Sequence, residues 1–264
     1  MDAEGIAVVT GASRGFGRAI AIELARAGFD VVATMRDPAA AGDLRDAVRG
    51  AAGTITVTRL DVTEPDTIAL PDGLRVLVNN AATEAEYLPV EAVPMAQWRD
   101  VFETNLFGLI EVTRRAVPIM RAAGGGVICN ITSASLAMSV PFYSVYRASK
   151  AAVQTMGESL RAEVGPFGIR VIEIMPGPVD TDMLAASARR PEAADCPGYE
   201  TMAAAMHEGR TAVEEFTTPP ATAAAAVLEA ILADDGPLRW SCDRLGRQLL
   251  AGWQADPDGF LAAR

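Results

Sequence analysis

Short apolar runs alternate with helix-like segments over the first two thirds of the chain, and this alternation constrains the fold more than any other feature. The apolar runs predict strands at residues 6–9, 31–34, 55–60, 76–78, 127–131 and 171–174, with a last one near 238–241. Helical patterns cover residues 18–27, 41–49, 97–122, 145–164 and 221–233. Strands that are apolar along their whole length are typical of parallel sheets covered by helices on both faces. We therefore predict an α/β fold with a doubly wound, mostly seven-stranded parallel sheet.

No linker long enough to separate two domains interrupts this pattern, so we expect residues 1–264 to form a single domain. After Pro176 the alternation becomes less regular. Residues 184–216 combine Met, Ala and charged residues with breaks at Pro191, Pro197 and Gly198. We expect a helical insertion in this segment, which is a candidate substrate lid.

Three glycines lie where the first predicted strand passes into the first predicted helix, at Gly11, Gly15 and Gly17. In a nucleotide-binding turn, one glycine permits the sharp turn, one lets a pyrophosphate approach the backbone, and one lets the helix pack on the strand. The helix N-terminus then offers free N–H groups and the positive end of its dipole to phosphate. The spacing alone leaves two interpretations open, a dinucleotide site or a turn without a ligand. The position between strand and helix favours the first.

The only lysine of the chain, Lys150, lies four residues after Tyr146, and every other basic residue except His207 is an arginine. On a helix, this spacing places both side chains on one face. A phenol with its ordinary pKa of about 10 is a poor base at neutral pH. A neighbouring ammonium would lower that pKa. The same pair can arise by chance in a helix, so its meaning depends on the other motifs.

Charge and rare residues narrow the classes of function. The formal net charge of −11 disfavours nucleic acid as a partner. His207 is the only histidine, which excludes a zinc site built on several histidines, and we expect no metal. The three cysteines are widely spaced, the first ten residues carry no basic side chain, and no long uncharged apolar run is present. We therefore expect a cytoplasmic protein without a membrane span.

Several motifs together resemble the short-chain dehydrogenase/reductase family in its compact single-domain form. They are Thr-Gly-x-x-x-Gly-x-Gly at residues 10–17, Asn-Asn-Ala-Ala at 79–82 and Tyr-x-x-x-Lys at 146–150, in the order and spacing of the family. The resemblance extends from about residue 5 to about residue 183 and is looser beyond. It implies a Rossmann-type fold, a nicotinamide cofactor, and hydride transfer between that cofactor and a carbonyl or alcohol carbon.

The resemblance also assigns catalytic roles to individual residues. Ser133 would hydrogen-bond the substrate oxygen, with Ser135 as an alternative or supporting hydroxyl. Tyr146 would exchange the proton, and Lys150 would bind the nicotinamide ribose and, together with the positive ring of the oxidised nicotinamide, lower the pKa of Tyr146. Asn105 would bend its helix and hold a water molecule that links Lys150 to solvent. The resemblance therefore implies a Ser-Tyr-Lys-Asn site.

Further residues are implied to bind the cofactor, from the glycine turn, the strand ends and the loop after the sixth strand. They are Gly11, Ser13, Arg14, Gly15, Phe16, Gly17, Arg36, Asp61, Val62, Asn80, Ala81, Tyr146, Lys150, Pro176, Gly177, Val179 and Thr181. An acid at the end of the second strand would hold the ribose 2′-hydroxyl of NAD, whereas an arginine accommodates the 2′-phosphate of NADP. Arg14 and Arg36 therefore favour NADP(H), although Asp37 follows directly.

One departure from the family pattern is Ala82, which stands where the family has glycine. If this position needs a positive φ, the alanine costs roughly 1–2 kcal/mol. If the position does not need a positive φ, the change is mild. The replacement bears on the fine placement of the cofactor rather than on its binding.

The resulting hypothesis is an NADPH-dependent ketone or aldehyde reductase, or the reverse alcohol dehydrogenase, acting on a small molecule. An NAD-linked catabolic alcohol dehydrogenase and a catalytically silent NADP-sensing regulatory protein stay open as alternatives. An epimerase or dehydratase would need a larger part after Thr181. The helices near 97–122 and 145–164 would form the interface of a homodimer or homotetramer, as in relatives. Candidates for an apolar substrate pocket are Leu136, Val140, Tyr143, Met183 and Tyr199.

Overall fold

The computed structural model describes residues 1–187 and 189–258, and at its centre lies a seven-stranded sheet whose strands all run parallel. The strands are β1 (Ile6–Val9), β2 (Asp30–Met35), β3 (Thr54–Arg59), β4 (Leu74–Asn79), β5 (Gly126–Ile131), β6 (Ile169–Ile174) and β7 (Arg239–Trp240). Their order across the sheet is β3-β2-β1-β4-β5-β6-β7. The winding direction reverses between β1 and β4, and ligands bind at the carboxyl ends of strands beside such a reversal. The predicted Rossmann-type sheet is confirmed.

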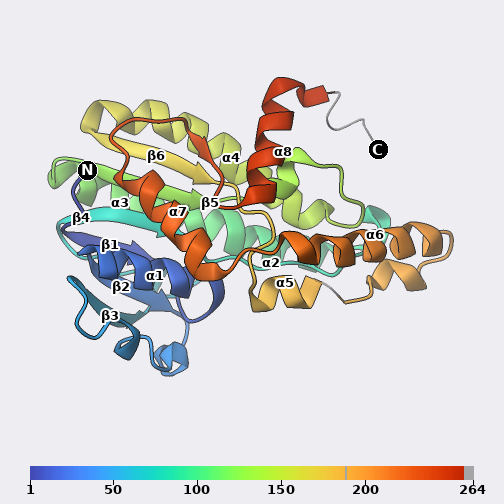
Figure 1. Ribbon diagram of the computed structural model, residues 1–264, viewed down its shortest axis with the longest axis horizontal. Helices are drawn as coiled ribbons and strands as arrows, with labels where there is room; N and C mark the ends of the chain where they lie inside the picture. Colours follow the sequence, from blue (N-terminus) through green and yellow to red (C-terminus); the bar gives the residue numbers. More distant parts are fainter. Residues whose placement is uncertain (188, 259–264) are drawn as a thin grey trace.

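Helices cover both faces of this sheet (Figure 1). Helices α1 (Gly15–Ala27) and α7 (Pro220–Leu232) pack on one face, while α3 (Leu109–Ala122) and α4 (Ser144–Val164) pack on the other. Neighbouring residues of β1 show why the strands are apolar at every position. Ala7 and Val9 belong to the core under α1 and α7, whereas Val8 belongs to the core under α3.

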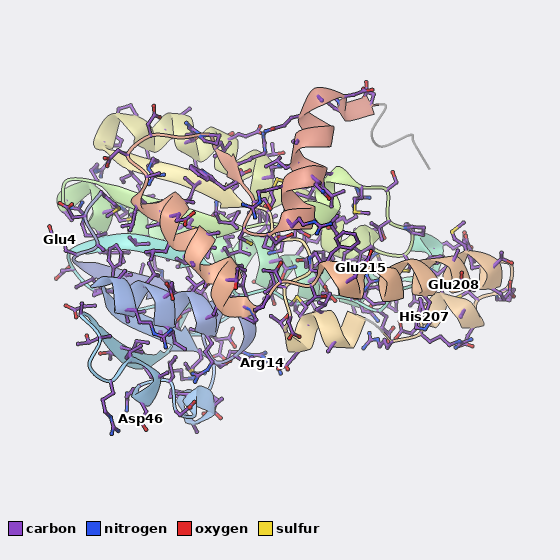
Figure 2. All side chains as sticks on the ribbon, in the orientation of Figure 1. Glu4, Arg14, Asp46, His207, Glu208 and Glu215 are labelled. Carbon is purple, nitrogen blue, oxygen red and sulfur yellow. The ribbon has the colours of Figure 1, made fainter. Side chains whose placement is uncertain are left out.

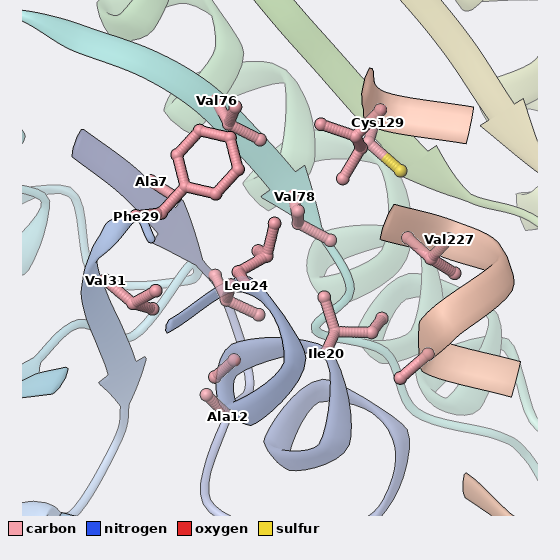
Figure 3. Packing of buried hydrophobic residues seen from close by; sticks show 14 of the residues in the cluster. Ala7, Ala12, Ile20, Leu24, Phe29, Val31, Val76, Val78, Cys129 and Val227 are labelled. Carbon is pink, nitrogen blue, oxygen red and sulfur yellow. The ribbon is translucent and has the colours of Figure 1, made fainter. Parts of the chain in front are cut away.

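The larger of the two cores joins α1 and α7 to the sheet, as Figure 3 shows. Ile20 and Leu24 are four residues apart, so they lie on the same face of α1, and both are almost fully buried. Val227 of α7 reaches the same cluster. Burying one such side chain stabilises the fold by roughly 1.5–3 kcal/mol. The core therefore fixes the start of α1 directly beyond the end of β1.

The helix predicted at residues 41–49 is wrong. The chain there forms two short 3-10 turns, Pro38–Ala41 and Asp46–Val48. Between them Gly42 has φ 56°, in the left-handed region that ends helices. The acidic and apolar spacing of this segment resembled a helix, but the glycine conformation interrupts it.

The helix predicted at residues 97–122 is instead three consecutive elements. Helix α2 (Met95–Phe102) passes into a π-helical turn, Glu103–Gly108, and then into α3. The wider turn contains Asn105, whose side chain is fully buried. Single π-helical turns inside α-helices are frequent at functional sites. Asn105 thus lies where the α-helical geometry is interrupted, and its role in bending the helix stays a prediction.

Helical elements occupy most of the described residues between 184 and 216, and their role as a substrate lid stays a prediction. Helices α5 (Asp182–Ser187) and α6 (Glu200–Ala212) lie beyond the carboxyl ends of the strands (Figure 1). The sequence did not predict the last helix, α8 (Arg244–Ala255), which begins at its N-cap residue Asp243. Helices α5, α6 and α8 lie near the carboxyl edge of the sheet, and the glycine turn between β1 and α1 lies at the same edge (Figure 1).

Candidate active site

The glycine turn between β1 and α1 needs glycine at each of its three positions. Gly11 and Gly15 have φ values of 66° and 57°, in the left-handed region. Gly17 has a steric requirement instead. A Cβ atom there would lie 2.3 Å from Asn80 Nδ2 and 2.5 Å from the Gly11 carbonyl oxygen. The start of α1 therefore packs closely against the end of β4 at this turn.

The N-terminus of α1 is suited to an anionic group. Its N-cap residue, Arg14, makes no side-chain capping hydrogen bond, and its first turn contains no acid. The first backbone N–H groups of a helix have no partner within the helix, so those of α1 are free of side-chain competition for a phosphate. Gly11, Ser13, Gly15 and Phe16 thus fit the pyrophosphate of a dinucleotide cofactor.

Asn80 and Ala81, at the end of β4, are tied to the glycine turn through backbone and hydroxyl groups. Thr10 Oγ1 accepts from the backbone N–H of Asn80 at 3.0 Å and of Ala81 at 3.1 Å. The side-chain amide of Asn80 donates to the Thr10 carbonyl at 2.9 Å. Among the described residues, Phe142 alone combines a side chain with a positive φ. Ala82 is thus unstrained, and its replacement of the family glycine is mild.

At the end of β2, two side chains are candidates to contact the cofactor ribose, and they differ in whether they already make a hydrogen bond. Arg36 is exposed, whereas the Asp37 carboxylate accepts a hydrogen bond from the Ala39 N–H at 2.9 Å and caps a 3-10 turn. Arg14, labelled in Figure 2, lies 3.4 Å from Asp182 at the start of α5, with both side chains mostly exposed. Such an exposed ion pair is weak. Both arginines can therefore turn toward a phosphate.

Two further segments contain the remaining residues that the sequence predicts to bind the cofactor. Asp61 Oδ1 accepts from the backbone N–H and the hydroxyl of Thr63 at 2.9 and 2.8 Å. The neighbouring Val62 is buried, and a Cβ on Gly108 of the π-helical turn would lie 2.7 Å from it. The loop from Pro176 to Thr181 follows β6, where Val179 is buried. Thr181 Oγ1 accepts from the Leu184 N–H at 3.4 Å, so this hydroxyl also contacts the start of α5.

Asp243 holds that loop in place, and sequence reasoning missed it. Its carboxylate is almost fully buried and accepts from the Gly177 N–H at 2.6 Å and from the Gly246 N–H at 2.7 Å. One carboxylate thus caps α8 and anchors the loop after β6. An Asp before a helical pattern is the sequence signal of an N-cap, but nothing local indicates that it reaches back to Gly177.

Tyr146 and Lys150 lie side by side on the buried face of α4. Lys150 is 2% exposed, and its ammonium donates to the Ile131 carbonyl at 2.7 Å. The same ammonium lies 5.7 Å from the centroid of the Tyr146 ring. Burial lowers the pKa of Lys150 to about 8, an effect that the negative charge of Glu84 partly opposes. The sole lysine of the chain is thus held beside the phenol at the end of β5.

The pKa of Tyr146 is raised rather than lowered by its protein surroundings. Burial is the largest cause, the negative charge of Glu84 adds to it, and a side-chain hydrogen bond with Ser133 opposes it. The sequence-based expectation considered the ammonium and the nicotinamide charge, and it included neither burial nor Glu84. Ser133 Oγ in turn lies 2.9 Å from Ser135 Oγ. Ser133 is therefore next to the tyrosine, and Ser135 is next to Ser133.

Asn105 joins the π-helical turn to two other parts of the site. Its amide donates to the Thr83 carbonyl at 2.9 Å and to Ser149 Oγ at 3.0 Å, while its carbonyl accepts from the Thr83 N–H at 2.8 Å. Ser149 Oγ donates onward to the Tyr146 carbonyl at 2.7 Å. Asn105 thus ties the chain after β4 to the turn of α4 that carries Tyr146. A water link to Lys150 stays a prediction.

A cluster of aromatic and charged side chains, which the sequence did not reveal, covers Tyr146. The ring of Tyr143 stacks on Tyr146, with centroids 4.9 Å apart and planes at 25°. Glu84 accepts from the hydroxyls of Tyr143 at 2.5 Å and Tyr87 at 2.7 Å. The guanidinium of Arg210, from α6, lies 5.1 and 4.4 Å from the centroids of these two rings. We call Glu84, Tyr87, Tyr143 and Arg210 the tyrosine cluster.

The predicted pocket residues divide into two groups. Val140, Tyr143 and Tyr199 pack with Tyr87, Phe142 and Met206 in one apolar cluster beside the site. Leu136 and Met183 are outside that cluster, and Met183 is exposed. Within residues 1–187 and 189–258, no group of three or more His, Cys, Asp or Glu side chains could hold a metal ion. No helix among them is long and apolar enough to cross a bilayer.

Comparison with known proteins gives one family match and several similar relatives. Residues 5–192 match the family described as short chain dehydrogenase. The uncharacterized oxidoreductase YusZ of Bacillus subtilis is 41% identical over 191 residues, which are 69% of this chain and 68% of that protein. Retinol dehydrogenase 8 of Bos taurus is 30% identical over 279 residues, covering 100% of this chain and 89% of the bovine protein.

Two solved structures resemble the whole chain and differ in their cofactor. A short chain dehydrogenase of Burkholderia cenocepacia in complex with NADP has a TM-score of 0.74 at 25% identity, covering 98% of this chain and 97% of that one. A short chain dehydrogenase/reductase of Burkholderia phymatum in complex with NAD has a TM-score of 0.79 at 25% identity, covering 99% and 97%. Nicotinamide cofactors of both kinds therefore occur on this fold.

Proposed function

The chain belongs to the short-chain dehydrogenase/reductase family, and from this premise we propose that it is an NADPH-dependent enzyme that interconverts a carbonyl compound and its alcohol. The observation that carries the proposal is the position of Tyr146 beside the buried ammonium of Lys150 and the hydroxyl of Ser133. These three groups are contributed by the end of β5 and the buried face of α4. A proton donor and a hydrogen-bond donor therefore converge on one point.

The residues of the site have distinct tasks. In reduction, Ser133 donates a hydrogen bond to the carbonyl oxygen, which polarises the bond as negative charge develops on that oxygen. Tyr146 gives its proton to the same oxygen. Lys150 holds a positive charge beside the phenol and stabilises the phenolate that remains. The bound nicotinamide supplies the hydride in reduction and accepts it in oxidation.

Charge at the end of β2 supports NADP(H) over NAD(H). Arg36 is exposed and Arg14 is held only by a surface ion pair, so two guanidinium groups are available for a 2′-phosphate. Asp37 would repel that phosphate, but the two guanidinium groups outnumber this single carboxylate, which is also hydrogen-bonded to the Ala39 N–H. An NAD-linked dehydrogenase would instead use an acid at this place to hold the ribose hydroxyls.

The rest of the chain has a supporting role in this proposal. Residues 1–264 act as one NAD(P)-binding unit, with 184–216 as the lid over a small-molecule substrate. Exposed Phe107 and Met95 lie on the α2–α3 side of the molecule, which supports a homodimer or homotetramer assembled through this side. Free thiols at Cys129, Cys196 and Cys242 support a cytoplasmic location.

Substitution of the phenol tests the proposal. A panel of carbonyl and alcohol compounds, followed by the absorbance of the reduced cofactor, first identifies a substrate. Tyr146→Phe should then lower kcat by about 10²–10⁴-fold, because the phenol is the proton donor. Cofactor binding, measured by fluorescence of the reduced nicotinamide, should be retained. A variant with normal turnover would remove Tyr146 from the chemistry and support the silent, cofactor-sensing alternative.

A further inference from the structure

The carboxylate of Glu84 is the centre of the hydrogen bonding in the tyrosine cluster. One of its oxygens accepts from the Tyr143 hydroxyl at 2.5 Å and the other from the Tyr87 hydroxyl at 2.7 Å. Glu84 is half-buried, in the segment that follows β4. Charge-assisted hydrogen bonds of this length are about twice as strong as neutral ones. Glu84 therefore fixes two aromatic side chains at once.

Tyr143 transmits this constraint to the reacting phenol. Its ring stacks on the ring of Tyr146 at 4.9 Å and 25°, and such stacking stabilises a pair of rings beyond the area they bury. Glu84 holds the outer end of Tyr143 by its hydroxyl. A lateral movement of Tyr146 would therefore disturb a ring whose hydroxyl is anchored.

Charge gives Glu84 a second effect on the phenol. Groups from the end of β5, from α4 and the residue before it, and from the segment after β4 act on Tyr146 directly. They are Ser133, Tyr143, Lys150, Glu84 and Tyr87, while Arg210 of α6 lies over the rings of Tyr87 and Tyr143. Glu84 is the carboxylate among them, and its negative charge raises the pKa of Tyr146 and of Lys150. A negative charge near a phenol disfavours the phenolate.

We propose that Glu84 is a positioning residue that holds the Tyr143 ring against Tyr146 and keeps the Tyr146 proton in place for donation to a carbonyl oxygen. The inference rests on the proposed function, because it concerns the same proton. In reduction the proton leaves the phenol for the substrate oxygen, and the phenolate is reprotonated from solvent. In oxidation the phenol must first lose its proton. The negative charge of Glu84 opposes this loss, so the rate of oxidation should rise only at higher pH.

The test compares pH profiles of turnover in both directions for the wild type, Glu84→Gln and Glu84→Asp. Glu84→Gln removes the charge with little change of shape. The pH midpoint at which oxidation rises and reduction falls should move down by about one pH unit. Glu84→Asp restores the charge and should recover most of that shift. A Glu84→Gln enzyme with reduced kcat and the wild-type midpoint would overturn the proposal, because Glu84 would then have a structural role alone.

Glu91→Gln is the matched control. Glu91 also accepts a hydrogen bond from a tyrosyl hydroxyl, that of Tyr199 at 3.2 Å, but Tyr199 packs edge-on against Phe142 and not against Tyr146. This control should keep the wild-type midpoint, and a shift equal to that of Glu84→Gln would overturn the assignment to Glu84. Thermal unfolding and cofactor fluorescence verify that each variant is folded.

A second variant keeps the proposal testable if Glu84→Gln does not fold. Tyr143→Phe retains the ring and the charge of Glu84 but removes the tether between them. It should lower kcat several-fold while the midpoint stays at or above that of the wild type. A midpoint that falls in Tyr143→Phe would overturn the proposal. Normal turnover in Tyr146→Phe would defeat the proposed function itself, whereas an inactive Tyr146→Phe with an unshifted Glu84→Gln would defeat this inference alone.

Discussion

The two sides of the carboxyl edge of the sheet are built in different ways. The cofactor side consists of backbone and small residues close together in the sequence, from Thr10 to Gly17, joined to the end of β4. The tyrosine cluster consists of large charged and aromatic side chains, and Glu84 and Arg210 come from segments far apart in the chain. Tyr146 lies where the two sides meet. The first side is thus defined mainly by local backbone geometry, and the second by side-chain contacts between remote segments.

On the cofactor side, one added methyl group should be enough to weaken cofactor binding strongly. Gly17→Ala places a Cβ 2.3 Å from Asn80 Nδ2 and 2.5 Å from the Gly11 carbonyl. Because backbone and a tethered amide cannot yield easily, the turn should shift, and affinity for reduced cofactor should fall by about 10²-fold or more. Titration by cofactor fluorescence measures this loss.

Gly209→Ala is the control for this change. Gly209 lies in α6, and a Cβ there meets no atom within 4 Å. The variant should bind cofactor as the wild type does and should unfold at an equal or higher temperature, because alanine favours helix more than glycine does. Wild-type affinity in Gly17→Ala would show that the turn is less constrained than its geometry indicates.

The arginine charges on the cofactor side should determine the preference for NADPH over NADH, and they should not affect proton or hydride transfer. The double variant Arg14→Ala, Arg36→Ala should weaken NADPH binding by about 10–100-fold, since each charged hydrogen bond to phosphate contributes roughly 1.5–3 kcal/mol and the exposed position reduces it. Affinity for NADH should change little. Separate titrations with the two reduced cofactors give both values.

Arg49→Ala is the matched control for the arginine pair. Arg49 is exposed and pairs with Asp46 three residues before it, away from the end of β2. It should leave the ratio of the two affinities unchanged. Equal affinities for NADPH and NADH in the wild type would contradict the assignment of Arg14 and Arg36 to the 2′-phosphate.

The smallest effect is expected on the side of the tyrosine cluster, at the contact that Arg210 of α6 makes with two rings. Arg210→Ala removes a guanidinium that lies over Tyr87 and Tyr143, an interaction of about 0.5–2 kcal/mol. We expect KM for the substrate to rise by about 2–30-fold with cofactor affinity unchanged. Steady-state kinetics with cofactor held at saturation separates the two quantities.

Arg190→Ala tests whether any arginine of the lid segment would act in the same way. Arg190 pairs with Asp195 on the surface, so its removal should leave KM near the wild-type value. A larger change in cofactor affinity than in KM for Arg210→Ala would mean that the two sides are not separable.

Much of the fold could be predicted from the sequence, because its signals are local. Continuous apolar strands indicated a parallel sheet, and the Gly11–Gly17 spacing marked the turn that begins α1. The prediction failed at residues 41–49, where the positive φ of Gly42 interrupts the expected helix. It also missed the link between α8 and the loop after β6, because the N-cap residue Asp243 accepts from the backbone N–H of Gly177, many residues earlier. Both failures concern conformations that depend on more than residue periodicity.

The sequence by itself determined the parallel sheet and the pairing of Tyr146 with Lys150, since four-residue spacing on a helix places two side chains on one face. The tertiary structure alone decided which acid approaches that pair. Nothing in the sequence distinguishes Glu84 from Glu86 or Glu91, and only the closure of the chain brings Glu84 to Tyr143. The same closure decided the pKa of Tyr146, because burial and the Glu84 charge are properties of the assembled site. Periodicity encodes which face a side chain occupies, whereas contacts between remote segments form only when the whole core packs.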